Sequence, residues 1–203
     1  MRFTTIAMSA ALTAPLLFSG SARAGQDKGA AKPTLADAEL QAVNKLHHAN
    51  EMEIEMGKLG TERAKAADVK SFAGRMVRDH KKADGKVTAL AKKRGATLAP
   101  PTPQNDDEKK KMDEAMATMA RLRGLEGEAF DREFMAAMVK DHAAALQLVT
   151  DSLAQAKDAS LVALLKGVKP VIEQHKATAE KIAGKQAGDG AKPAPSAPKP
   201  TKG

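Results

Sequence analysis

Apolar and small side chains recur close to the 3.6-residue period along most of the chain, which predicts amphipathic α-helices. Four long helices are expected, together with a shorter helix between the second and the third. Their expected ranges are 35–66, 68–95, 105–122, 128–156 and 158–182. No alternating β-branched run occurs in the sequence, so the domain is predicted to be all-α.

Polar residues mark the expected starts of these helices. Asp68 is expected to cap the second helix, Asn105 or Asp106 the short helix, and Asp158 or Ser160 the last. Only a tight turn separates the two helices of each hairpin, so they are expected to be antiparallel neighbours. The segment between the hairpins is long enough for the short helix to carry the chain back along the bundle. The predicted fold is therefore a four-helix bundle with an additional short crossover helix between helices 2 and 3, which are parallel.

One pattern, F-x-x-x-M-V-[RK]-D-H-x-x-A, occurs twice, at residues 72–83 and 134–145. Each copy places one histidine, His80 or His142, on the apolar face of its helix. Counted from Asp68 and Phe130 near the starts of their helices, His80 and His142 both lie 12 residues in, so parallel helices place them at one height.

Two further residues fall at the same height. Counted from the first turn, at Ala67, Glu53 lies 14 residues before it and His80 lies 13 after, a difference of about 1.5 Å along the helix axis. Counted from the second turn, at Asp158, His142 lies 16 residues before it and His175 lies 17 after. The four residues are therefore predicted to meet in the middle of the bundle, one from each long helix.

Three imidazoles and one carboxylate at Glu53, His80, His142 and His175 are a donor set for a transition metal, with Zn, Fe, Mn and Cu as the candidates. Asp79 and Asp141 each precede one of these histidines and are candidates for orienting the imidazole of a neighbouring helix. The alternative interpretation is that the histidines are hydrogen-bonded core residues that fix the register of the helices.

A second candidate metal site involves His48, Met52 and Met56, which recur at intervals of four residues on one helix face. Imidazole nitrogen and thioether sulfur together suit copper. The alternative is that the methionines fill the core, which is their commoner use. The pair His47-His48 has no further role that its spacing suggests.

Four segments together resemble a known family. Residues 52–59, 72–80, 130–142 and 170–175 are similar, in order and spacing, to segments of the domain-of-unknown-function family 4142. This is a family of exported, ferritin-like helical-bundle proteins of bacteria. The resemblance covers roughly residues 38–182 and implies a ferritin-like four-helix bundle, a periplasmic or secreted location, and no settled activity.

A ferritin-type di-iron centre is disfavoured by the residues around the histidines. Such centres use Glu-x-x-His motifs. In this sequence, the residues three positions before the histidines are Val77, Val139 and Ile172.

Composition divides the chain into four parts. Residues 1–24 have one early cation, an apolar run and the sequence Ala-Arg-Ala, which predicts a secretory signal peptide. The run is too short and too broken for a membrane span. Residues 25–34 are expected to be a flexible leader, 35–183 the helical domain, and 184–203 a disordered tail rich in Pro, Ala and Lys. The periplasm is the expected location, with no transmembrane segment in the mature chain.

Charge and composition exclude several partners and chemistries. The formal net charge of +8 falls to about +3 without the signal peptide and tail, and the chain has no Tyr or Trp to stack on bases. Nucleic acid binding is therefore not expected. The only expected contact of this kind is a weak one with anionic envelope surfaces. The chain also has no cysteine, which excludes disulfides and thiolate sites.

The sequence thus predicts an exported bundle protein that binds a metal ion or small ligand at its mid-bundle cluster, without catalysis. One alternative is a metal-dependent redox or metal-handling enzyme that uses the same centre. The other is a purely structural or envelope-interaction module.

Overall fold

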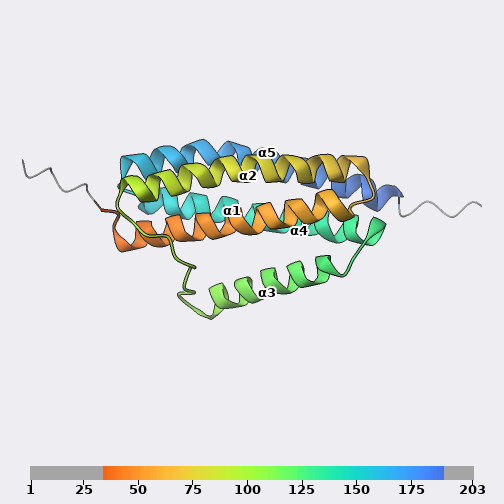
Figure 1. The fold of residues 1–203 in the computed structure, drawn as a ribbon, viewed down its shortest axis with the longest axis horizontal. Helices are drawn as coiled ribbons and strands as arrows, with labels where there is room; N and C mark the ends of the chain where they lie inside the picture. Colours follow the sequence, from red (N-terminus) through yellow and green to blue (C-terminus); the bar gives the residue numbers. More distant parts are fainter. Residues whose placement is uncertain (1–33, 190–203) are drawn as a thin grey trace, which may run out of the picture. The chain divides into compact units, whose positions relative to one another are not determined.

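The computed structural model describes residues 34–189, which form five helices (Figure 1). The expected signal peptide, most of the expected leader and the end of the expected tail lie outside this range. The helices are α1 (Asp37–Arg63), α2 (Ala67–Lys93), α3 (Asp106–Arg123), α4 (Gly127–Gln155) and α5 (Ala159–Asp189). No strand occurs among the described residues, so the all-α prediction is confirmed. None of these helices is both long and apolar enough to cross a membrane.

Helices α1, α2, α4 and α5 form a bundle, and α3 runs along its outside (Figure 1). Antiparallel α1 and α2 form one closely packed hairpin, and α4 and α5 form the other. α3 returns the chain to the end of the bundle where α2 began, so α2 and α4 run in the same direction, as the crossover predicts (Figure 1). Met119 and Leu122 of α3 are buried, and they anchor α3 to the bundle.

The apolar core consists of two clusters that lie towards opposite ends of the bundle. The first contains Phe72, Phe130 and Phe134, and the second contains residues such as Val87 and Val149. On α2, α4 and α5, the residues between the two clusters include the three histidines singled out by the sequence. The histidines therefore form a polar layer across an otherwise apolar core.

The turn of each hairpin is held by a buried carboxylate from the other hairpin. Asp131 of α4 accepts hydrogen bonds from the amides of Lys65 and Ala66, at 2.9 and 2.8 Å. Glu39 of α1 accepts from the amides of Lys157 and Asp158, both at 2.7 Å. Because unpaired buried amides are costly, these bonds fix the ends of the two hairpins against each other.

The predicted helix caps are correct at two of the three positions. Asn105 caps α3 by accepting from the amide of Glu108, and the Asp158 carboxylate accepts from the first amides of α5. The prediction for Asp68 is wrong, because the cap residue of α2 is Ala66 and Asp68 lies in the first turn. The amide of Ala66 is bound by Asp131, a contact from a distant segment that local sequence cannot reveal.

Helix α5 is longer than the sequence predicts. It continues to Asp189, whereas the helical domain was expected to end at residue 183. The added stretch contains lysine, glutamine and alanine, which favour helix, beside two glycines, which do not; it contains no proline, and the next proline after Pro170 is Pro193.

Gly57 and Gly60 allow α1 to lie close against α2. A Cβ at Gly60 would lie 2.7 Å from the Cβ of Ala73 and 3.0 Å from the ring of Phe134. At Gly57, an added Cβ would approach the carbonyl oxygen of Ala73 to 3.0 Å. The two glycines are therefore required by packing, although glycine weakens a helix interior.

Gly60→Ala is expected to lower the free energy of unfolding by roughly 1 kcal/mol or more, because overpacking outweighs the gain in helix propensity. Gly85→Ala is the matched control, since an added Cβ there meets no atom within 4 Å. This control should raise stability by about 0.5–1 kcal/mol. Urea unfolding of both variants measures the difference, and equal effects of the two changes would contradict the close contact.

Candidate metal centre

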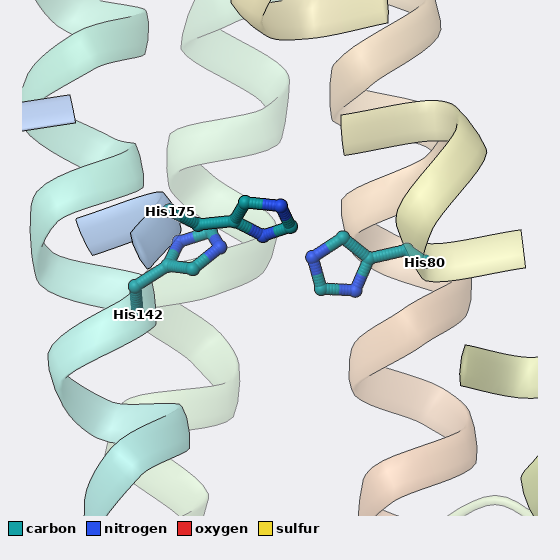
Figure 2. A group of neighbouring side chains, drawn as sticks. All are labelled: His80, His142 and His175. Carbon is teal, nitrogen blue, oxygen red and sulfur yellow. The ribbon is translucent and has the colours of Figure 1, made fainter. Parts of the chain in front are cut away.

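Three histidines from three helices converge between the two apolar clusters (Figure 2). His80 comes from α2, His142 from α4 and His175 from α5. One ring nitrogen of each lies within 4.8 Å of those of the other two. The side chains are buried, with exposed fractions of 9%, 1% and 1%. The equal heights counted from the sequence thus correspond to a real juxtaposition of these three residues.

Each imidazole uses one ring nitrogen to bind a neighbouring oxygen. These bonds join His80 Nδ1 to Asn50 Oδ1 (2.9 Å), His142 Nδ1 to the Met138 carbonyl oxygen (2.8 Å), and His175 Nε2 to Asp79 Oδ2 (2.9 Å). Because all three partners are acceptors, the ring nitrogen in each bond carries the proton. In a neutral imidazole, the other nitrogen then carries a lone pair.

The second nitrogen of each ring has no partner among the described residues. These atoms are His80 Nε2, His142 Nε2 and His175 Nδ1, and all three are buried. A buried acceptor without a partner typically costs about 1–3 kcal/mol, so three of them at one place need an explanation. A bound cation that accepts three lone pairs provides one.

Burial keeps the rings of His80 and His142 in the neutral form that can bind a metal. Burial, followed by the neighbouring His142 and His175, lowers the pKa of His80 to about 3. Burial is also the main reason that the pKa of His142 falls to about 4. Both rings are therefore neutral near pH 7, and neutral imidazole is the form that binds metals.

Glu53 lies beside this triad of histidines and is not one of its mutually close donors. Its Oε1 is 3.8 Å from His142 Nδ1, the nitrogen that donates to Met138. Its Oε2 is buried without a hydrogen-bond partner. Burial, reinforced by the charge of Asp141, raises the pKa of Glu53 well above its usual value and so favours the neutral carboxyl. The mutually close donors are thus the three histidines, with the Glu53 carboxyl beside His142, and coordination of a metal by Glu53 stays a prediction.

Asp79 and Asp141 occupy equivalent places in the repeated pattern but have different surroundings. Asp79 accepts from His175 on a neighbouring helix, as expected of an orienting carboxylate. Asp141 makes no hydrogen bond to an imidazole within the described part of the chain, and an orienting role for it stays a prediction. Burial raises the pKa of Asp141 to about 6. The two aspartates differ because they face different helices. Asp79 of α2 lies next to α5, whereas Asp141 of α4 is close to Glu53 of α1.

Asn50 contacts the triad although its place in the sequence did not predict this. It orients His80 from α1, and its side chain is buried. A polar amide on the apolar stripe of α1, three residues before Glu53, was the available signal.

The second candidate site has the surroundings of a core. Met56 is buried in the cluster around Phe72, and Met52 packs against the same cluster. His48 is half-buried on the same helix. Its neighbour His47 bonds Asp84 of α2 at 2.6 Å. Methionine packing accounts for Met52 and Met56, and copper binding by His48, Met52 and Met56 stays a prediction.

The family of the chain follows from its sequence as a whole. Residues 24–182 match the family model described as "Domain of unknown function (DUF4142)". The protein belongs to the DUF4142 family. No curated protein matches it by sequence.

Solved structures with the same fold come from other proteins. A DUF305 fragment from Deinococcus radiodurans aligns with a TM-score of 0.66 and 19% identity, over 75% of this DUF4142 chain and 99% of the fragment. A DUF305 protein from Streptomyces coelicolor aligns at 0.61 and 13%, over 74% and 94% of the two chains. CopM in its Cu(II)-bound form aligns at 0.59 and 12%, over 72% and 96%. At these identities, the similarity concerns the fold alone.

In the metal-free protein, the rings of His80 and His142 should stay neutral down to about pH 5, since burial lowers both pKa values. In the unfolded chain they titrate near 6.5, so each ring's contribution to stability is complete above that pH and is lost as the pH falls towards the folded-state pKa. Asp141 acts in the opposite direction, because its pKa is raised. The imidazole nitrogen signals in NMR report each ring separately and are therefore a better measurement than stability, and a midpoint near 6.5 for either His80 or His142 would contradict their burial as neutral rings.

Proposed function

We propose that this DUF4142 protein binds one divalent transition-metal ion through His80 Nε2, His142 Nε2 and His175 Nδ1. The observation that carries the proposal is the coincidence of three features in these atoms. They are buried, they lack partners among the described residues, and their rings converge on one point. Hydrogen-bonded core histidines that only fix register would pair these nitrogens with one another or with neighbouring donors.

The donor set narrows the choice of metal. Three neutral imidazoles favour Zn, Cu, Fe or Mn over Mg or Ca, which prefer oxygen. Each ring also donates a hydrogen bond through its other nitrogen, to Asn50, Asp79 or the Met138 carbonyl. In metal sites such hydrogen bonds orient the rings and increase their basicity. CopM, which shares the fold, has been solved with Cu(II) and with Ag. Copper and zinc are therefore the first metals to test.

The proposed role is metal binding by an exported protein rather than catalysis. Export rests on the signal peptide predicted for residues 1–24 and on the expected location of the family. The competing function is a metal-dependent redox or metal-handling enzyme, because three protein ligands leave a coordination position open, as in catalytic zinc sites.

The metal-free protein should bind one equivalent of Zn or Cu, measured by calorimetry and by elemental analysis after gel filtration. The double variant His80→Ala/His142→Ala should lose at least a hundredfold in affinity, because two of the three ligands are absent. His48→Ala is the control and should bind like the parent. Circular dichroism of each variant confirms that the helices are intact.

Sub-stoichiometric metal in the parent would contradict the proposal, as would unchanged metal in the folded double variant. Loss of metal in His48→Ala alone would move the site to the second candidate set. With metal bound, turnover of peroxide or oxygen would favour the enzyme over the binding protein.

A further inference from the structure

A cavity of about 310 Å³ adjoins the histidine triad between α2 and α5. Its lining includes His80 and His175, together with the two residues that orient them, Asn50 and Asp79. A volume of this size is at the lower end of the range for small-molecule sites. The cavity therefore borders two of the three histidines, His80 and His175, and can admit a molecule of a few carbon atoms.

The rest of the lining is mostly apolar. It includes Leu46, Val87, Leu164 and Ile172. Val171 also lines the cavity, and 38% of its surface is exposed. Apolar walls next to a polar group favour a ligand with an apolar body and one polar end.

The charges around the cavity favour an anion at that polar end. A divalent ion bound by three neutral imidazoles keeps its charge of +2, because none of the three mutually close donors is an anion. Lys82 and Lys86 also line the cavity, and neither forms an ion pair within the described residues. The one carboxylate in the lining, Asp79, already binds His175.

Gly167 of α5 lies in the wall of this cavity and contributes no side chain to it. The glycine lines the cavity, and an added Cβ there would meet no atom within 4 Å. Glycine in a helix interior is about 1 kcal/mol less favourable than alanine, and no close contact requires it at this position. Its effect is to keep the space open.

We propose that the cavity holds a small monocarboxylate with a short apolar chain, whose carboxylate binds the metal at the position that the three histidines leave open. This inference rests on the proposed metal binding and adds the class of ligand. The chain of the ligand lies against the apolar wall, and the two lysines stabilise its charge.

The test uses the full chain loaded with Co(II), whose visible absorption reports its coordination. Titration with acetate, propanoate, butanoate and pentanoate should change the spectrum, with affinity rising about fourfold per added methylene. The amide of butanoate has the same shape without the charge and should bind at least tenfold more weakly. The metal-free protein should bind all of these ligands more weakly still.

Gly167→Leu should reduce butanoate affinity at least tenfold, because the new side chain narrows the cavity. Gly184→Leu is the matched control in the same helix, where an added Cβ also meets no atom within 4 Å and the residue does not line the cavity. Both variants should bind Co(II) like the parent, which separates loss of the ligand from loss of the metal.

Three results would overturn the inference. They are bound Co(II) with no spectral response to any carboxylate, affinity that does not depend on chain length, and equal effects of Gly167→Leu and Gly184→Leu. The first two leave metal binding intact, so the proposed function would survive them. A parent protein that binds no metal would overturn both proposals.

Discussion

Three imidazole nitrogens without partners among residues 34–189 lie buried at one height between two apolar clusters, and this polar layer is the feature that folding alone does not explain. Each ring is fixed by a hydrogen bond on its other side, so the rings cannot turn to satisfy the free nitrogen without losing that bond. An apolar layer here would be cheaper for folding alone, because buried polar atoms without partners cost free energy. A ligand that satisfies all three nitrogens at once offsets this cost, and a metal ion does so with one atom.

The architecture serves to hold the three rings at one level. The crossover through α3 makes α2 and α4 parallel, which brings the two copies of the repeated pattern to the same height (Figure 1). Asp131 and Glu39 fix the turn of each hairpin against the other, so the hairpins cannot slide along their axes without breaking these bonds. Close contact through Gly57 and Gly60 sets the distance between α1 and α2. The relative heights of the histidines therefore depend on contacts at both ends of the bundle and between them.

The helical rise explains why sequence alone could place the triad. Every residue advances the helix by about 1.5 Å, so counting from the turns gives the height of each side chain without knowledge of its neighbours. Height is one coordinate, however, and direction around the helix and rotamer decide the contacts. Glu53 has the right height, but its carboxyl lies beside His142 rather than with the three mutually close nitrogens. Asp79 and Asp141 likewise have the same sequence context and different neighbours. Asn50 is the opposite case: its place in the sequence did not predict a contact with the site, but it binds and orients the ring of His80.

Anomalous X-ray diffraction from crystals of the metal-loaded protein, recorded on both sides of the absorption edge of the bound metal, tests the central claim most directly. Metal binding by the triad predicts one strong peak at about 2.0–2.1 Å from His80 Nε2, His142 Nε2 and His175 Nδ1, the distance usual for zinc and imidazole. A peak elsewhere, such as at His48 and Met52, with the triad nitrogens bound to water or to one another, would contradict it.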